Sequence, residues 1–454
     1  MTTVRVIIIG GGIAGLATAV RLINYGIKPV VVEKRPFLGG RAFSFYDRES
    51  GEEIDNGQHV FLGACDQFQQ YINQIGGTDQ VLLNERIGFP VIKRGKTSWI
   101  KAKNLPTKLV NLVALLGYNH IGLIGKARIL WGLLLILLSN TKSQVKHDKI
   151  NFDQWLRNRA QNNETIENFW NLIVLPSLND QITAVSAKIG IELFKVALLS
   201  SAKNPAIGIP LEGLSTLLGE NARRYIENNG GEIHTGVAID SLDFSEGRAV
   251  GVTSVNGLIF KGDAVVSAVP AAAMLRLNPT KHIKSNNFFE AAKYVQTAPI
   301  VAIHIWYDRH VMNEPYAAIL DSPLQWVFNE TMLKSKKDTS QHIVISLSGA
   351  WEWKDRTKTE LRSIFVDAMK ESFPLTREAS IEKFTVVKML DATFRVTPGS
   401  SLTRLQQRTP IPNFYLAGDW TDTGWPSTME SAVRSGNIAA KFIVEDVSSA
   451  MCKQ

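Results

Sequence analysis

Val4-Arg5-Val6-Ile7-Ile8-Ile9-Gly10-Gly11-Gly12-Ile13-Ala14-Gly15 is the stretch of sequence that decides the fold. The apolar run 4–9 is typical of a buried strand, 13–25 has the spacing of a helix that ends at Gly26, and Pro29–Val32 is predicted as a second strand. In a G-x-G-x-x-G turn, the first glycine makes the tight turn, the second lets the backbone approach a pyrophosphate, and the third lets helix pack on strand. Free N–H groups at the helix N-terminus favour that anion. The pattern therefore predicts a βαβ unit that binds a dinucleotide.

Glu33 supports the same prediction, because it ends the second predicted strand about twenty residues after the glycine motif. A carboxylate in this position hydrogen-bonds the ribose hydroxyls of the nucleotide. The alternative, a glycine-rich turn in an ordinary α/β domain, leaves Glu33 unexplained. The residues predicted to bind the cofactor in this first segment are Gly10, Gly12, Ile13, Ala14, Gly15, Glu33 and Lys34.

Two motifs further along the chain favour FAD over NAD. Gly39-Gly40-Arg41 follows Glu33 closely, so a glycine pair can lie against a second part of the cofactor while Arg41 pairs with phosphate oxygens. The alternative for this stretch is a solvated turn. Asp55-Asn56-Gly57-Gln58-His59 comes next. The cofactor-binding residues predicted here are Gly39, Gly40, Arg41, Asn56, Gly57, Gln58 and His59.

A third motif lies near the end of the sequence, where Leu416-Ala417-Gly418-Asp419-Trp420 is followed by Ser427-Thr428-Met429-Glu430. A strand that ends in Gly-Asp can present its carboxylate to a ribityl hydroxyl. Ser427 and Glu430 have the spacing of a capping box, which predicts that a helix begins here with its positive end toward the pyrimidine edge of a flavin. As a bare capping box, the motif indicates only the start of a helix. The candidates for cofactor binding are Gly418, Asp419, Ser427, Thr428 and Met429.

Composition sets the broad class of the protein. The chain has 454 residues, of which 45% are hydrophobic and 20% charged, as in globular proteins that divide into two lobes. Its two cysteines, Cys65 and Cys452, are far apart, which argues against a disulfide scaffold, a zinc site or a dithiol centre. We expect no metal site and a reducing, cytoplasmic location. The start of the sequence leaves no room for a signal peptide, and no run of about 18 apolar residues predicts a transmembrane helix.

The segment Lys101–Ile150 is both basic and apolar. It holds eight Lys or Arg and one acid, Asp148, so it carries +7 of the net charge of +8. Basic residues beside the apolar runs Leu109–Leu116 and Ile129–Leu138 suit an anionic membrane surface better than nucleic acid, so no nucleic-acid partner is expected. The second run would form about 15 Å of helix, half the ~30 Å hydrocarbon core, and cannot span a bilayer.

Two interpretations of this run stay open. It could lie in the membrane interface while basic side chains reach lipid phosphates, which would place the protein peripherally on the inner face of the membrane. The alternative is that its leucines close the core of the substrate lobe. The residues expected to reach phosphates are Lys126, Arg128 and Lys142.

The rest of the chain divides into segments of different character. Leu82–Ser200 is predicted to be helical with few strands, a helix over Leu214–Tyr225 to stop at Asn229-Gly230, and Glu232–Val269 to be a small β-meander. Further strands are predicted at Ile300–Tyr307, Ile343–Ser348 and Phe414–Ala417. We expect an FAD-binding domain from 1–81, 210–270 and 403–454, and a substrate-binding domain from 82–209 and 271–402, with 101–150 as its membrane-contacting segment.

Taken together, the motifs resemble one family. Gly10–Gly15 with Glu33, Gly39-Gly40-Arg41 and Ala417-Gly418-Asp419 are similar, from end to end of the chain, to the amine oxidase and phytoene desaturase group of flavoproteins. The resemblance implies an α/β, Rossmann-like FAD-binding domain assembled from discontinuous segments, with an inserted α+β substrate domain. The residues that it implies for the middle FAD segment are Pro210-Leu211-Glu212-Gly213 and Val237, whose backbone would contact the adenine.

Four stretches are similar in particular to the hydroxysqualene dehydroxylase subfamily: Asp55–Phe61, Phe169-Trp170, Leu178-Asn179 and Ala417–Pro426. This resemblance implies reductive removal of the hydroxyl group from a C30 isoprenoid alcohol, giving squalene as a hopanoid precursor. Reduced FAD would supply hydride, and the electron donor is unknown. Ser431 stands where the wider family often has glycine, and the sequence around Asn179-Asp180-Gln181 departs from the family pattern.

The implied chemistry requires an acid that protonates the departing hydroxyl and an apolar tunnel for the substrate. His59, Asp180 and Asp422 are the candidate acids because each lies near a motif expected at the flavin, and His59 is favoured. The alternative for His59 is a histidine bonded to backbone or to FAD itself. Phe61 and Trp425 are candidates for lining the tunnel and shielding a cation, although aromatic side chains are more often core. Two other functions stay open: a carotenoid-type desaturase and a non-catalytic flavoprotein that carries isoprenoid lipid.

Overall fold

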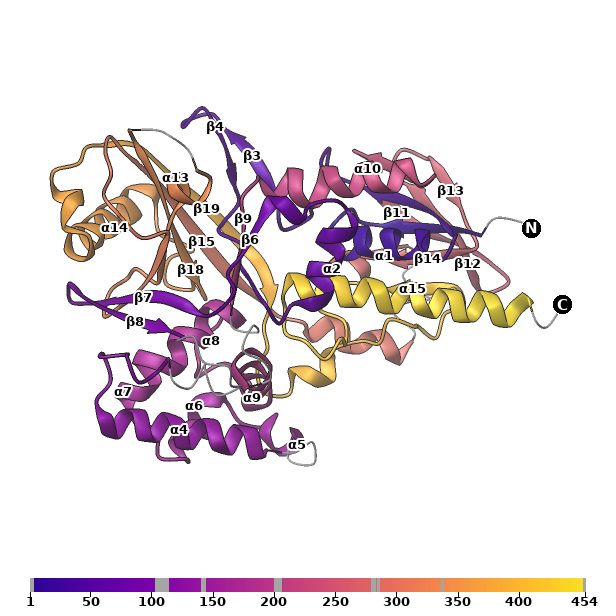
Figure 1. Cartoon of the computed structure of the whole chain (residues 1–454). Helices are drawn as coiled ribbons and strands as arrows, with labels where there is room; N and C mark the ends of the chain where they lie inside the picture. Colours follow the sequence, from indigo (N-terminus) through magenta and orange to yellow (C-terminus); the bar gives the residue numbers. More distant parts are fainter. Residues whose placement is uncertain are drawn as a thin grey trace.

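The computed structural model describes residues 4–102, 114–139, 144–199, 206–278, 283, 286–335 and 339–451. Two lobes lie side by side (Figure 1), one built on a five-stranded sheet and the other on a seven-stranded sheet with a cluster of helices below it. Both termini lie at the outer end of the first lobe. Among the described residues, no helix combines the length and the apolar character needed to cross a bilayer.

The five-stranded sheet is parallel throughout, as the glycine motif predicts. β1 (Arg5–Ile9) lies at its centre with its apolar side chains buried, as is usual for parallel strands that helices cover on both faces. α1 (Ile13–Ile23) packs against α15 (Met429–Met451), where a Cβ on Gly436 would lie 2.6 Å from the Ala14 carbonyl oxygen. The carboxyl ends of the strands meet at one edge, where ligands bind in such sheets. The strand order is β10 (Glu232–Thr235), β2 (Lys28–Glu33), β1, β14 (Ala264–Ser267) and β20 (Phe414–Leu416).

A small antiparallel sheet of three strands sits beside it, formed by β11 (Ile239–Ser245), β12 (Arg248–Ser254) and β13 (Ile259–Lys261). The predicted turns at Glu246-Gly247 and Asn256-Gly257 are confirmed, because the second residue of each has a positive φ. The prediction of one meander over Glu232–Val269 is wrong at both ends. β14 is fully buried and pairs in parallel with β1, so both outer strands join the larger sheet. A π-helical segment (Ser215–Glu220) and α10 (Asn221–Asn228) precede β10.

The seven-stranded sheet contains the strands predicted at 300–307 and 343–348. Its order is β19 (Ile381–Phe394), β15 (Thr297–Tyr307), β18 (Gln341–Ser348), β17 (Trp326–Asn329), β16 (Tyr316–Leu320), β7 (Gly88–Lys93) and β8 (Lys96–Lys101). The expectation of few strands after Leu82 is wrong for β7 and β8. They form a hairpin whose turn residues, Arg94 and Gly95, both have positive φ, and β8 alternates between buried and exposed side chains. α13 (Glu330–Leu333) and α14 (Lys358–Ser372) pack on this sheet.

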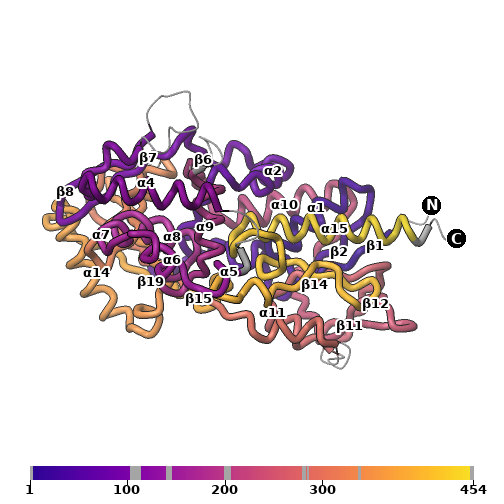
Figure 2. The backbone as a smooth tube through the Cα atoms, turned by 90° about the horizontal axis from the view of Figure 1, so that it is seen from below, coloured from indigo at the N-terminus to yellow at the C-terminus, as the bar shows by residue number. Residues whose placement is uncertain are grey.

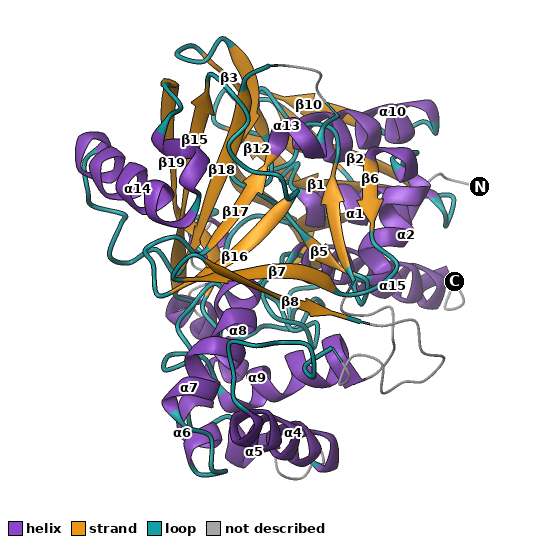
Figure 3. Cartoon of the chain, turned by 60° about the vertical axis from the view of Figure 1, so that its left-hand side comes forward, coloured by secondary structure: helices purple, strands orange, loops and turns teal. Residues whose placement is uncertain are grey.

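Short elements complete the fold, and several of the helices among them form the cluster below the seven-stranded sheet (Figures 2 and 3). The strands among them are β3 (Ser44–Asp47), β4 (Glu52–Asp55), β5 (Phe61–Leu62), β6 (Val81–Leu83) and β9 (Ile207–Pro210). The helices are α2 (Asp66–Gln74), α5 (Gln144–His147), α6 (Phe152–Arg157), α7 (Asn163–Thr165), α8 (Asn171–Leu178), α9 (Ala187–Phe194) and α11 (Ala271–Met274). Further turns are π-helical (Ile166–Trp170, Lys195–Leu199) or 3-10 (Thr78–Gln80, Asn287–Tyr294, Pro374–Arg377, Ser400–Thr403). The domain boundaries expected from the sequence stay a prediction.

α4 (Leu123–Leu138) forms the lower margin of the helical cluster (Figure 1) and carries two apolar faces. One face packs into the core through Ile129, Leu133 and Ile136. The other is exposed and consists of Leu123, Ile124, Leu130, Trp131, Leu134, Leu137 and Leu138. The core interpretation of the Ile129–Leu138 run is therefore right for the buried face, and contact of the exposed face with a membrane stays a prediction.

The predicted role of Lys126 at lipid phosphates is wrong. Its side chain is buried, and its ammonium group donates to the Leu116 carbonyl oxygen at 2.8 Å, which satisfies the charge within the lobe. Lys103, Lys108, Lys142 and most of Leu109–Leu116 lie outside the described residues. Among the described residues of the segment 101–150, the exposed basic side chains are Lys101, Lys146 and Lys149, and Arg128 is half-buried.

Candidate cofactor and active site

The two glycine motifs pack backbone against backbone at the carboxyl end of β1. Gly10 has a φ of 107°, and a Cβ on Gly15 would lie 2.0 Å from the Gly10 carbonyl oxygen, so both positions require glycine. A Cβ on Gly40 would lie 2.8 Å from the Gly12 Cα. Gly12 is the N-cap of α1 and provides no side-chain acceptor, so the first N–H groups of this helix are suited to an anion. The geometry fits the pyrophosphate of a dinucleotide.

Glu33 lies where the strand order brings β1, β2 and β10 together. It is only 7% exposed, and its carboxylate accepts N–H bonds from Gly11 at 2.6 Å and from Arg35 at 2.8 Å. The Val237 N–H donates to the Glu33 carbonyl oxygen at 2.9 Å. The first and middle cofactor segments are therefore neighbours. The contacts of Glu33 with ribose and of Val237 with adenine stay predictions.

Arg41 joins the second cofactor motif to the third. Its guanidinium forms an ion pair with Asp419, a residue 378 positions further along the chain, and donates to the Ala392 carbonyl oxygen at 3.0 Å. Asn56 holds the same segment in place, because its side chain accepts from the Phe43 N–H at 3.1 Å and donates to the Arg41 carbonyl oxygen at 2.9 Å. Three predicted motifs thus meet at one edge of the parallel sheet.

Arg404 organises the loop that follows Asp419 and was not predicted. It donates to the carbonyl oxygens of Trp425 at 2.6 Å, Thr421 at 2.5 Å and Asp419 at 3.1 Å. Burial lowers the pKa of this guanidinium, with the nearby Asp422 and Asp419 opposing the shift. Ser431, which stands where the wider family often has glycine, adds to the network by donating to the Asp419 carbonyl oxygen at 3.1 Å. The sequence around 404 contains no motif that could have indicated this role.

The predicted capping box at Ser427 and Glu430 is wrong, although the helix begins where it predicts. Ser427 instead donates to the Asp419 carboxylate and accepts from the Phe394 N–H. Thr428 caps α15 by accepting from the Ser431 N–H at 3.2 Å. Glu430 accepts from the Phe68 N–H at 2.7 Å and so caps α2, and it pairs with Arg434. The side chains of Ser427 and Glu430 therefore bond to groups on other elements instead of forming the local hydrogen bonds of a capping box.

The three candidate acids have different partners. His59 Nδ1 lies 2.8 Å from the Gly57 carbonyl oxygen, and burial lowers its pKa despite that bond. Asp180 is buried and forms an ion pair of 2.6 Å with Arg395. Asp422 is exposed and accepts from the Gln406 amide at 2.9 Å. The backbone-bonded alternative describes the position of His59, and a catalytic role for any of the three stays a prediction.

The two aromatic candidates lie near these motifs but pack against protein. The Phe61 ring is buried, with its centroid 5.2 Å from that of Phe68, and Gly208 leaves room for it. Trp425 is partly buried, with the Arg434 guanidinium 4.6 Å from its ring centroid. Their contact with substrate stays a prediction.

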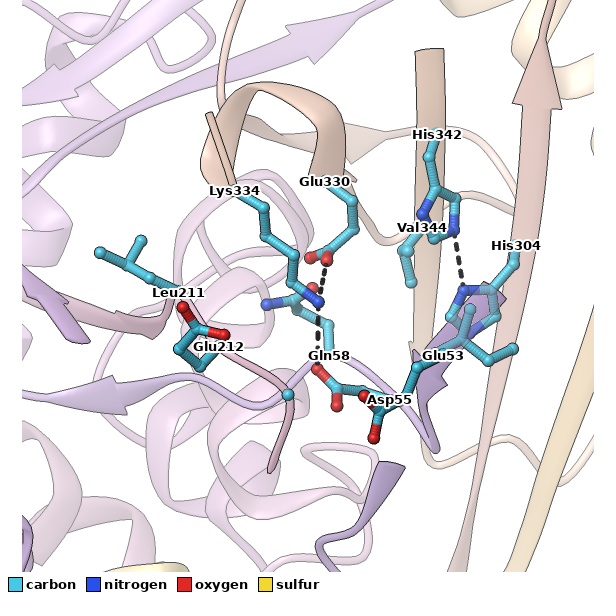
Figure 4. Close-up of a pocket in the computed structure, with 13 residues that line it drawn as sticks. Glu53, Asp55, Gln58, Leu211, Glu212, His304, Glu330, Lys334, His342 and Val344 are labelled. Atoms are coloured by element: carbon cyan, nitrogen blue, oxygen red, sulfur yellow. Dashed lines mark hydrogen bonds and ion pairs between the residues drawn. The ribbon is translucent and has the colours of Figure 1, made fainter. Parts of the chain in front are cut away.

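A cavity of about 270 Å³ opens between the lobes beside Gly57 and Gln58 (Figure 4). Lys334 lies in it between two carboxylates, 2.8 Å from Glu330 and 3.6 Å from Asp55. A pair of histidines forms another part of the wall, with His304 Nδ1 3.0 Å from His342 Nε2. Asp55 ends β4 and begins a predicted cofactor motif, whereas the other groups come from α13 with its C-cap, β15 and β18, and no sequence motif contains them.

Known proteins share the arrangement of segments described above. Residues 13–444 match the protein family described as flavin containing amine oxidoreductase. The 15-cis-phytoene desaturase of Capsicum annuum is 27% identical over 97% of this chain and 78% of its own length. The 15-cis-phytoene desaturase of Synechococcus elongatus is 26% identical over 97% of this chain and 96% of its own length. The structure of wild-type putrescine oxidase bound to putrescine has a TM-score of 0.73 at 15% identity, covering 98% of this chain and 99% of that one.

These matches confirm four predictions. The fold is the expected α/β, Rossmann-like fold of FAD-binding oxidoreductases, matched over nearly the entire chain. FAD is the cofactor, and the chain is an FAD-dependent oxidoreductase. The resemblance to the amine oxidase and phytoene desaturase group is confirmed as well.

Proposed function

Because the chain belongs to the family of flavin containing amine oxidoreductases, we propose that it is a dehydroxylase that reduces hydroxysqualene, a C30 isoprenoid alcohol, to squalene. The position of the run Asp419–Pro426 carries this proposal. The run is similar to the hydroxysqualene dehydroxylase subfamily, and its first residue pairs with Arg41 in the second cofactor motif. The start of this run therefore lies against a cofactor segment rather than on a remote surface.

The proposed reaction replaces one C–O bond by a C–H bond. The alcohol R–OH takes up a hydride and a proton and leaves as R–H and water. Bound FAD in its reduced form supplies the hydride. The protein must hold the alcohol, exclude bulk water and deliver the proton. Among the three candidate acids, His59 is favoured, since Asp180 is paired with Arg395 and Asp422 is exposed.

Desaturation of a carotenoid precursor is the second candidate. The relatives named 15-cis-phytoene desaturase favour it. This reaction removes two hydrogens and passes the electrons to an acceptor. Its substrate is a hydrocarbon without a polar group, whereas the cavity beside Gly57 is lined by ionisable side chains. Because a hydroxylated substrate can use those side chains, we place dehydroxylation first. A non-catalytic carrier of isoprenoid lipid is the alternative of another class.

Product analysis separates these functions. Purified holoenzyme is incubated without oxygen, either with hydroxysqualene and a reductant or with phytoene and a quinone acceptor, and the lipids are identified by mass spectrometry. We expect squalene in the first incubation and unchanged phytoene in the second, with no squalene when the reductant is omitted. Desaturated phytoene would favour the second candidate. If neither lipid gives a product, only the non-catalytic carrier function remains.

We also propose that α4 docks the substrate lobe on an anionic membrane surface, which delivers a lipid of negligible solubility in water. Seven apolar side chains are exposed along one face of this helix, and an exposed apolar face of this size marks an interaction site. Lys101, Lys146 and Lys149, from the same basic segment of the sequence, provide exposed positive charge. The inner face of the cytoplasmic membrane is the location that this proposal implies.

A further inference from the structure

The cavity between the lobes contains an ion cluster that is already satisfied within the protein. Lys334 lies between Glu330 and Asp55. Burial alone would lower the pKa of Lys334, but the two carboxylates outweigh it and the net effect raises the pKa. Asp55 is held further by the Ser44 hydroxyl at 2.7 Å and the Leu214 N–H at 2.9 Å. This side of the cavity is therefore a fixed, charged wall.

The histidine pair on the opposite wall is different, because one nitrogen has no partner. His304 is 2% exposed, and its ring Nε2 is buried without a hydrogen bond within the described part of the chain. His342 is held in place by stacking on Trp306, with ring centroids 4.1 Å apart. Burial lowers the pKa of His304 to about 4, so the ring is neutral at pH 7. His304 lines the cavity while its Nε2 is closed off behind the ring, so a small shift of the ring would let a ligand complete the hydrogen bonding of this nitrogen.

The position of His304 relates this nitrogen to the cofactor segment. Residues two apart on a strand face the same side, so Ala302 and His304 share one face of β15. A Cβ on Gly57 would lie 3.8 Å from the Ala302 Cβ, so this face of the strand lies against the segment predicted to bind the flavin. Gly57 and Gln58 themselves line the cavity. A ligand held by His304 would thus lie next to the cofactor.

The chemistry of the walls defines the ligand. A neutral histidine offers either a donor or an acceptor at Nε2, depending on its tautomer, and a hydroxyl group pairs with both. Anions are disfavoured, because the cavity is lined by one lysine and four carboxylates, Glu53, Asp55, Glu212 and Glu330. A cavity of about 270 Å³ is too small for a C30 chain but holds the polar carbon and its neighbours.

We propose that this cavity is the hydroxyl-binding subsite of the enzyme, in which His304 Nε2 binds the hydroxyl group of an isoprenoid alcohol and selects it over the hydrocarbon and over phosphate esters. This inference rests on the proposed dehydroxylase function for the identity of the carbon skeleton. It assigns His304, which no motif indicates, as a specificity residue.

The test measures binding separately from turnover. Oxidised holoenzyme, which has no hydride to give, is titrated with hydroxysqualene or squalene in the same detergent micelles, and the change in the flavin spectrum gives the affinity. We expect wild type to bind the alcohol about tenfold more tightly, the fold-change for one net hydrogen bond. His304→Phe, which keeps the ring shape, should lose this preference without weaker squalene binding. His304→Gln should restore part of it, and His310→Phe, at an exposed histidine of the same lobe, should retain all of it.

Equal affinity of wild type for alcohol and hydrocarbon would overturn the proposal, and so would a His304→Phe variant that keeps the preference. The content of bound FAD shows whether each variant has folded. If His304→Phe does not fold, the proposal is decided by whether wild type binds the alcohol more tightly than squalene. Failure of the dehydroxylase function looks different. In that case wild type prefers the alcohol through His304 but makes no squalene when reduced. Conversely, if the enzyme makes squalene but its preference for the alcohol does not depend on His304, the dehydroxylase function stands and the proposed subsite is refuted.

Discussion

Glu33 is predicted to bind the ribose at the adenosine end of the cofactor. Its carboxylate accepts bonds from the N–H groups of Gly11 and Arg35, and its carbonyl oxygen accepts the Val237 N–H. Glu33→Ala removes a charge-assisted acceptor worth about 1.5–3 kcal/mol, so we expect FAD to bind roughly 10- to 100-fold more weakly. Fluorescence titration of apoprotein with FAD measures this change. Glu232→Ala, at an exposed carboxylate on neighbouring β10, is the control. Unchanged FAD affinity in Glu33→Ala would contradict the assignment.

Arg404 allows a second prediction, on the stability of the loop against the cofactor. Arg404→Met leaves three backbone carbonyl groups of the loop without their charged donor. We expect a loss of at least about 2 kcal/mol in the free energy of unfolding, together with weaker FAD binding. Arg404→Lys should recover little, because an ammonium cannot reproduce the guanidinium fork. Urea unfolding measures the effect. Arg408→Met, at an exposed ion pair, should cost about 1 kcal/mol or less, and an equal loss in both variants would refute the role of Arg404.

His304 makes stability depend on pH with a defined sign. Its folded pKa of about 4 lies below the ordinary 6.5, so the unfolded chain binds more protons between these values. Wild type should therefore lose stability as pH falls from 6.5 to 4, by at most about 3 kcal/mol from this residue. In His304→Gln this pH-dependent loss is absent. As the pH falls from 6.5 to 4, the free energy of unfolding of the variant should therefore rise relative to that of wild type. Urea unfolding at several pH values measures the difference, and parallel curves would contradict the buried, neutral histidine.

At the scale of residues, the sequence predicts what local geometry dictates. The turn at Gly10–Gly15 and the acid at Glu33 follow from one βαβ unit, and both occur as expected. His304, Lys334 and Asp55 could not be predicted together, because the strand order of the second lobe alone brings them to one cavity. Arg404 has no local pattern, since its partners lie 15 to 21 residues away.

At the scale of elements, α15 shows the limit of local rules. The spacing of Ser427 and Glu430 predicted both the start of the helix and its cap, and only the start is right. Glu430 finds a better partner in the free N–H groups at the beginning of α2, which the sequence between them cannot reveal. The hairpin of β7 and β8 was missed for a related reason, because it borders a long helical region and pairs with β16 from residues 316–320.

α4 yields a prediction at this scale, on membrane binding. Leu134→Glu with Leu138→Glu places two charges on the exposed face without touching the buried one. We expect co-sedimentation with anionic liposomes to fall at least about tenfold, because each buried leucine contributes about 1.5–3 kcal/mol. Binding by wild type should weaken as salt rises, since lysines act through screened charge. Leu402→Glu, at a leucine that is 84% exposed elsewhere, is the matched control. Wild type that stays in the supernatant at low salt would contradict membrane docking.

At the scale of the whole molecule, the two lobes divide the work. The parallel sheet gathers cofactor motifs from both ends of the chain, and the ion pair of Arg41 with Asp419 joins them. The second lobe contributes a polar cavity at the cofactor segment and an apolar helix face at its outer margin (Figure 1). A lipid alcohol that enters from a membrane and presents its hydroxyl at the flavin would use both features.

The direction of electron flow between flavin and lipid distinguishes dehydroxylation from desaturation. Holoenzyme is reduced without oxygen and mixed with hydroxysqualene in a stopped-flow instrument, and the visible absorbance band of oxidised flavin is followed through one turnover. We expect this band to return and one squalene to form for each flavin reoxidised. Dehydroxylation would be contradicted if reduced flavin stayed colourless with hydroxysqualene while oxidised flavin was bleached by phytoene, because the enzyme would then be a desaturase.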